Sequence, residues 1–229
     1  MTTFELIDIY LFDYISTAHR KELKGECGCC SMVEEMNSIR VKYLTPGYEI
    51  KGVINECVCN RHGHQYRIPK KAVEKAVEEL MKSKVYSGSP FIKGGKFVAK
   101  FVDFEELYEF VKSVIGGISG IGPLTIYDTA RRIGHLFDTP IYPKEYVYLA
   151  AGAKDGAKNL LKNKICYPLK DRVPKELFSP FFGTLSSAFV EDILCIFKKD
   201  IGNLDQKNVK QVRISADKLL KSKMIEKVV

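Results

Sequence analysis

The sequence predicts a mainly α-helical protein with a small β-containing part near the N-terminus, an α+β fold. Two observations predict the helices: apolar residues recur at intervals of three and four, and glycine or proline stands at many of the segment ends. A third observation predicts the β-containing part, because strand-like residues flank a turn signal between residues 38 and 56. We therefore expect helices to dominate, with one β-hairpin among them.

The length of 229 residues suits one large domain or two small ones. We expect an N-terminal module over residues 1–95 and a helical module over residues 96–229, because glycine and proline cluster between residues 87 and 95. A hydrophobic share of 45% with 28% charged residues is typical of a soluble globular protein. No apolar run reaches the ~20 residues of a membrane helix, and Glu5, Asp8 and Asp13 interrupt any signal peptide. The expected location is the cytoplasm, with no membrane partner.

The N-terminal module is expected to contain two helices and a β-hairpin. Thr2 and Glu5 form a capping box for a helix that ends near Gly25. Residues 38–44 and 49–56 are predicted as two strands joined by a turn at Thr45–Tyr48. Pro69 opens an amphipathic helix, whose predicted apolar face consists of Ala72, Val73, Ala76, Val77, Leu80 and Met81.

The second module is expected to be helical almost throughout. Residues 96–102 predict a brief strand before the first helix. Later segments predict helices at 142–149, 152–161 and 181–197, followed by a final amphipathic helix from Val209.

The middle of the chain predicts a helix, a tight turn and a second helix. Apolar residues follow helical spacing over residues 104–115 and again over residues 126–137. Between them stands Ile118-Ser119-Gly120-Ile121-Gly122-Pro123-Leu124-Thr125. Glycine permits a crowded or left-handed backbone, and Pro123 suits the first turn of the second helix.

This stretch resembles the helix-hairpin-helix motif of DNA repair proteins and polymerases, in which hydrophobic-x-Gly-hydrophobic-Gly is often followed by Pro-x-Thr. The resemblance covers residues 104–137 only. It implies binding to the DNA backbone independently of sequence, since amides at a helix N-terminus and the helix dipole both attract phosphate. The expected DNA-binding residues are Gly120, Ile121, Gly122, Leu124, Thr125, Arg131 and Arg132. The alternative is a protein-interaction module in which the turn only packs two helices.

DNA glycosylases that carry this motif suggest a second alternative, an enzyme. Bifunctional members have a catalytic Lys just before the motif's Thr, where this chain has Leu124. Their catalytic Asp follows about seventeen residues after that Thr, and Tyr142 stands there. Asp138 and Glu145 fit only after a shift. A divergent glycosylase-like or DNA-end-processing enzyme therefore stays an alternative, and no catalytic residue is assigned.

Five of the seven cysteines and two of the four histidines lie between residues 27 and 64. In a cytosolic protein such a cluster favours a metal over disulfides. Two residues separate Cys27 from Cys30, and two separate Cys59 from His62. This spacing suits two ligands of one tetrahedral Zn²⁺ ion. We therefore predict a structural zinc site of Cys27, Cys30, Cys59 and His62 that holds the two ends of the expected hairpin together. The possible substitutes are Cys29, Cys57 and His64. Reduced buried cysteines, a disulfide and an iron–sulfur cluster are alternatives.

The charge of the chain favours an anionic partner. The net charge is +8 and the isoelectric point about 9.0, which is typical of proteins that bind nucleic acid. From Lys198 to the end, nine basic residues stand against four acidic ones. We expect this tail either to assist DNA binding or to form a solvated helix face.

Overall fold

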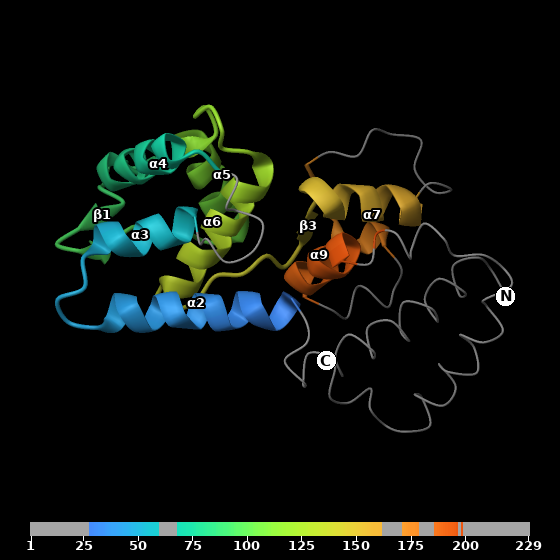
Figure 1. Cartoon of the computed structure of the whole chain (residues 1–229), viewed down its shortest axis with the longest axis horizontal. Coiled ribbons are helices and arrows are strands. Elements are labelled where there is room, and N and C mark those ends of the chain that lie inside the picture. The colour runs from blue at the N-terminus through green and yellow to red at the C-terminus, as the bar shows by residue number, and fades with distance from the viewer. Residues whose placement is uncertain (1–27, 60–67, 162–170, 179–185, 197, 199–229) are drawn as a thin grey trace, which may run out of the picture. The chain divides into compact units, whose positions relative to one another are not determined.

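The computed structural model describes residues 28–59, 68–161, 171–178, 186–196 and 198 (Figure 1). The chain divides into two compact units, one formed by Val33–Pro143 and the other by Met1–Met32 together with Lys144–Val229. The boundary expected near residue 95 falls inside the first of these units. The described residues are mainly helical with a few short antiparallel strands, which confirms the α+β class.

The expected β-hairpin over residues 38–56 is wrong: this segment lies in two helices, α2 (Gly28–Leu44) and α3 (Ile50–Val58), joined by a turn. A strand would place Ile39 and Val41 on the same face. Instead Ile39 is buried while Val41 is 65% exposed. On a helix these residues point in different directions, and the side chains three or four positions apart share a face. In α3 the buried side chains are accordingly Val53, Ile54, Cys57 and Val58.

The helix after Pro69 is confirmed as α4 (Lys70–Lys82). The buried side chains of α4 are Ala72, Val73, Ala76, Val77 and Leu80, as the apolar pattern predicts, while Met81 is only half-buried. A helix with one apolar face packs that face on its neighbours, and α4 lies against α3 and α5 (Figure 1).

Two helices flank the motif, α5 (Phe104–Ile115) and α6 (Pro123–Leu136). They pack against each other, and α6 also packs against α3. Nearly every residue of α6 is buried, so this helix runs through the core of the Val33–Pro143 unit. The expected helix over residues 104–115 is confirmed, and the second helix begins at Pro123, which was expected in its first turn.

A small antiparallel sheet follows α4. Its strands are β1 (Ile92–Lys93) and β2 (Lys96–Phe97), with a turn at Gly94 and Gly95. Both glycines have positive φ, which a two-residue hairpin turn of this kind needs. Aromatic rings fix the sheet to the helices, because Phe91 lies 4.9 Å from Phe110 and 5.1 Å from Phe97, centroid to centroid. The strand expected over residues 96–102 is therefore shorter than predicted.

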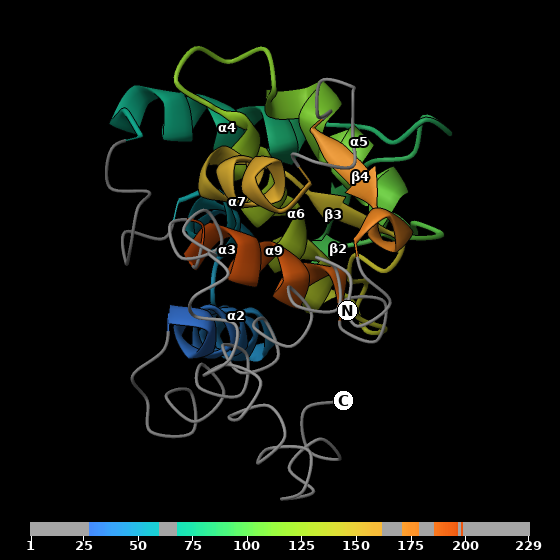
Figure 2. The ribbon, with the colours of Figure 1, turned by 90° about the vertical axis from the view of Figure 1, so that its right-hand side faces the viewer.

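In the other unit, β3 (Tyr146–Tyr148) pairs with β4 (Arg172–Pro174), and a short 3-10 helix η2 (Lys175–Leu177) follows. The helix expected over residues 142–149 is therefore wrong. Helix α7 (Ala151–Leu161) matches the expected helix from residue 152, and α9 (Ser187–Ile196) lies beside it (Figure 2). The expected first and last helices lie outside the described residues. None of the described helices combines the length and the apolar character that crossing a membrane requires.

Candidate nucleic-acid interface

The link between α5 and α6 is a tight turn held by its own backbone and by two isoleucines. The amide of Ile118 donates to the carbonyl of Ile115 at 3.1 Å, and that of Ile121 to the carbonyl of Ile118 at 3.0 Å. Both isoleucine side chains are buried, while Gly120 between them is exposed with φ 94°. A residue with a side chain rarely adopts this φ, so the turn requires glycine at this position.

The N-terminus of α6 lacks a capping side chain. Its N-cap is Gly122, in an extended conformation with φ −101°, and Pro123 occupies the first turn. The carbonyl of Gly122 accepts from the amide of Ile126 at 3.1 Å. By their position in the first turn, the amides of Leu124 and Thr125 have no acceptor within the helix. The first turn also carries no acidic side chain, so these donors and the positive end of the dipole remain available to an anion.

Helix α5 is built in the opposite way at its N-terminus. The Asp103 carboxylate accepts from the amide of Glu106 at 2.9 Å, and the Glu106 carboxylate accepts from the amide of Val102 at 2.7 Å. Acidic side chains therefore satisfy the amides of α5 and its dipole. The same chain caps one helix of the pair with carboxylates and leaves the other uncapped next to an exposed turn.

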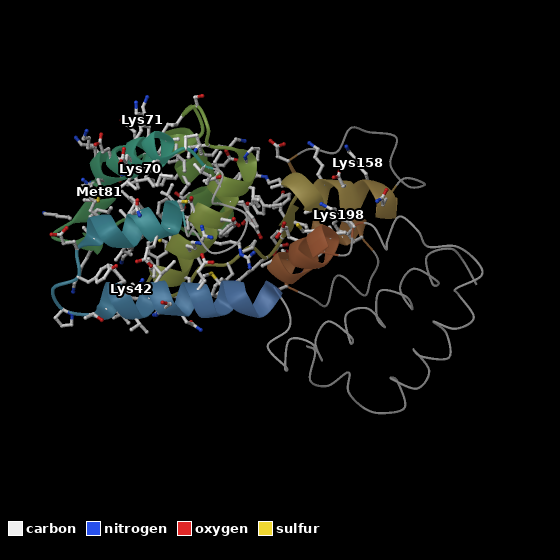
Figure 3. The ribbon with its side chains drawn as sticks, in the orientation of Figure 1. Lys42, Lys70, Lys71, Met81, Lys158 and Lys198 are labelled. Carbon is white, nitrogen blue, oxygen red and sulfur yellow. The ribbon has the colours of Figure 1, made fainter. Side chains whose placement is uncertain are left out.

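Helix α4 meets the turn at Gly120. A Cβ added to Gly120 would lie 3.1 Å from Cδ of Pro69 and 3.3 Å from Cβ of Ala72. The N-terminus of α4, which also has no side-chain cap, therefore lies against the turn. Its first residues are the exposed Lys70 and Lys71 (Figure 3). We call the turn Ser119–Thr125 together with Lys70 and Lys71 the hairpin site.

Lysine at a helix N-terminus opposes the helix dipole and adds no stability there. Lys70 has one partner on its own helix, Glu74 at 3.7 Å, and its side chain is 78% exposed. Sequence reasoning missed both lysines, because nothing in the sequence indicates that Pro69 packs on Gly120. The signal that could have drawn attention to them is the Pro-Lys-Lys start of a helix without an acidic first turn.

The seven expected DNA-binding residues divide into two groups. Gly120 is exposed and Gly122 and Leu124 are partly exposed, whereas the side chains of Ile121 and Thr125 are buried. Two of the expected residues, Arg131 and Arg132, are correctly placed on α6 but not on its surface, since only 6% and 2% of their areas are exposed.

Arg132 is occupied inside the Val33–Pro143 unit. Its Nε donates to the Glu35 carboxylate at 2.5 Å, and its Nη1 donates to the Cys57 carbonyl at 3.0 Å. Arg131 lies with its guanidinium 5.4 Å from the centre of the Tyr127 ring. Both arginines are therefore buried in the fold, and their contact with phosphate stays a prediction. The exposed Lys70 and Lys71 follow Pro69, which packs on Gly120 of the turn.

Only part of the cysteine and histidine cluster lies in the described residues. Cys27, His62 and His64 lie outside them, and Cys29 and Cys30 lie on α2 with undescribed side chains. Cys59 follows α3 as its C-cap. Within the described part of the chain, no three Cys, His, Asp or Glu side chains are placed to hold a metal ion. The Cys57 side chain is buried in the core, and this burial raises the pKa of its thiol to about 12.

Tyr142 stands where glycosylases of this type have their catalytic Asp, and in this protein it contacts a histidine. The Tyr142 hydroxyl lies 2.8 Å from Nδ1 of His135, whose Nε2 lies 3.0 Å from Oδ1 of Asn37. Because an amide oxygen only accepts, Nε2 carries the proton and Nδ1 accepts from Tyr142. Burial, assisted by Arg40, lowers the pKa of His135 and favours this neutral form. Asp138 is exposed.

Comparisons with known protein families, with curated proteins and with solved structures give no match to this chain.

Proposed function

We propose that this protein binds DNA through phosphate contacts at the hairpin site, without reading the base sequence. One observation carries the proposal: the N-terminus of α6 is partly exposed beside a glycine turn and lacks both a capping side chain and an acidic first turn. Free amides at a helix N-terminus are donors suited to phosphate oxygens. Contacts of this kind position a protein on DNA but carry no base information.

The surroundings of the turn support an anionic partner. Lys70 and Lys71 add positive charge where Pro69 packs on Gly120. The net charge of +8 acts in the same direction over the whole chain. DNA is favoured because the residues of this turn match the helix-hairpin-helix pattern and the two helices beside it are formed.

Gly122→Val is expected to weaken DNA binding at least tenfold while the protein stays folded. The backbone of Gly122 is extended, and a Cβ added there would meet no atom within 4 Å. The fold therefore accommodates a Cβ at this position, and we expect the valine side chain to obstruct an anion that approaches the α6 amides. Fluorescence anisotropy with a labelled duplex measures the affinity, and circular dichroism checks the fold.

Gly117→Val is the matched control for Gly122→Val, because it also replaces glycine by valine in the segment between α5 and α6. A Cβ at Gly117 also meets no atom within 4 Å, and this residue lies before the turn instead of at the start of α6. We expect its affinity to equal that of the parent. If folded Gly122→Val also binds as the parent does, the turn is only a helix connector, and the protein-interaction alternative replaces DNA binding.

We also propose a structural zinc ion bound by Cys27, Cys30, Cys59 and His62. The purified protein is then expected to contain close to one equivalent of zinc. Binding to such a site contributes directly to folding, so a chelator should lower the melting temperature. Elemental analysis and a thermal melt with and without chelator measure both effects. Metal-free protein with an unchanged melting temperature would contradict the site.

A further inference from the structure

A second basic surface follows the C-terminus of α4. Between Glu79 and Asp103 the chain has no acidic residue. This stretch contains five exposed lysines, Lys82, Lys84, Lys93, Lys96 and Lys100. Within the described residues, none of them forms an ion pair with a carboxylate. We call these five residues the lysine surface.

The backbone of the lysine surface is ordered by antiparallel pairing. Lys84 bridges to Pro90, and the amide of Val85 donates to the carbonyl of Ser89 at 2.9 Å. The chain then turns again at Gly94 and Gly95 into the β1–β2 pair. The amide of Val98 donates to the carbonyl of Phe91 at 3.1 Å. Three short segments therefore lie side by side and present lysines at fixed places.

Aromatic contacts fix this small sheet to the core of its unit. The ring of Phe97 lies 5.4 Å from Tyr43 on α2 and 5.8 Å from Phe137, which follows α6. The ring of Phe91 lies 4.9 Å from Phe110 on α5. A basic surface held by such contacts is preorganised, and less conformational entropy is lost when it binds.

The register of the sheet brings two like charges together. Lys93 and Lys96 are direct partners across the β1–β2 pair. Like charges directly opposite each other destabilise a sheet, since their Cβ atoms are only ~5 Å apart. The fold gains nothing from this pair, but an anion placed against it would remove the repulsion and be held by both ammonium groups.

The lysine surface and the hairpin site lie at opposite ends of α4. The turn touches Pro69 at the N-terminus of α4, whereas Ser83 at its C-terminus leads directly into the lysine surface (Figure 1). Helix α4 has 13 residues, so its ends are about 20 Å apart at ~1.5 Å per residue. That distance corresponds to about six base pairs of duplex at ~3.4 Å per pair.

We infer that the lysine surface is a second contact for the DNA phosphate backbone, separated from the hairpin site by the length of α4. The inference rests on the proposed function, because it gives the same partner a longer footprint. Exposed lysines that form no ion pair within the described residues match a polyanion with regularly spaced charges better than a single anion. The exposed Tyr86, between Lys84 and Lys93 in sequence, adds a ring able to contact sugar or base.

The test is the salt dependence of DNA binding by the full chain with the double variant Lys93→Ala/Lys96→Ala. Each lost phosphate contact lowers the slope of log K against log salt by ~0.9, so we expect the slope to fall by about 1.8. The matched control is Lys144→Ala/Lys158→Ala, which removes two exposed lysines of the other unit and the same charge. The control should keep the parent slope. Anisotropy with a labelled duplex of about 20 base pairs, between 50 and 200 mM salt, gives both slopes.

The possible results distinguish failure of the lysine surface from failure of the hairpin site. If the parent binds and Lys93→Ala/Lys96→Ala keeps the parent slope, the lysine surface is not a contact, and Gly122→Val alone decides the hairpin site. If the slope falls for Lys93→Ala/Lys96→Ala while folded Gly122→Val binds like the parent, the lysine surface stands and the hairpin site fails. A parent that binds no DNA at low salt overturns both. If the parent binds polyglutamate as tightly as it binds DNA, the partner of the lysine surface is an acidic protein and not DNA.

Discussion

Replacing Arg132 by alanine is expected to lower the free energy of unfolding by about 3–5 kcal/mol, because the Glu35 carboxylate then stays behind without its cation. The pair is desolvated, with 2% of the Arg132 side chain and 10% of the Glu35 side chain exposed. The substitution also leaves the Cys57 carbonyl without the Nη1 donor. Chemical denaturation monitored by circular dichroism measures the change.

The control for this prediction is the double variant Glu35→Leu/Arg132→Met, which removes both charges and keeps most of the volume. Replacement of a buried ion pair by apolar side chains is often neutral, so we expect much of the lost stability to return. DNA affinity of Arg132→Ala, measured where it is still folded, should equal that of the parent. Weakened binding with unchanged stability would instead restore Arg132 as a phosphate contact.

Gly156→Leu is expected to destabilise the unit that contains α7 and α9 by about 3 kcal/mol or more, as overpacking of a close helix contact does. A Cβ at Gly156 would collide with the backbone carbonyl of Leu194, and one at Gly152 would lie 2.8 Å from Sγ of Cys195. Backbone atoms cannot rotate away as a side chain end can, so the two helices would have to separate. The thermal melting temperature measures the loss.

Asp155→Leu is the matched control for the helix contact. It introduces the same side chain one residue earlier, at an exposed position of the same helix. Leucine is a good helix former, so we expect the melting temperature to change little. Equal melting temperatures for the two variants would show that α7 and α9 do not require glycine at position 156.

The sequence determined the helices whose apolar residues form one clear stripe. Helices α4 and α5 begin and end close to the predicted residues because their apolar periodicity is regular and Pro69 marks the start of α4. The turn between α5 and α6 was predicted for the same reason, since Gly120, Gly122 and Pro123 leave few alternatives for the backbone. Local patterns suffice wherever the local preference and the packing coincide.

The β-hairpin prediction failed because local strand preference and tertiary packing disagree in this segment. Residues 38–56 contain β-branched and aromatic residues that alternate locally, but only a helix places Met36 and Ile39 together in the core and leaves Val41 exposed. Strand propensity is worth little compared with such burial. The predicted zinc site relied on a β-hairpin to bring its two pairs of ligands together, and two of its four ligands, Cys27 and His62, lie outside the described residues, so the site stays a prediction.

Only the tertiary structure decided which cations are exposed and which are buried. Arg131 and Arg132 follow the motif in sequence, but α6 is buried nearly all round and Arg132 pairs with Glu35. Lys70 and Lys71 are about fifty residues away in the chain from Gly120, and the helix that they begin meets the turn because Pro69 packs on Gly120. The sequence shows the number of charges, but their positions depend on long-range packing, which no local pattern encodes.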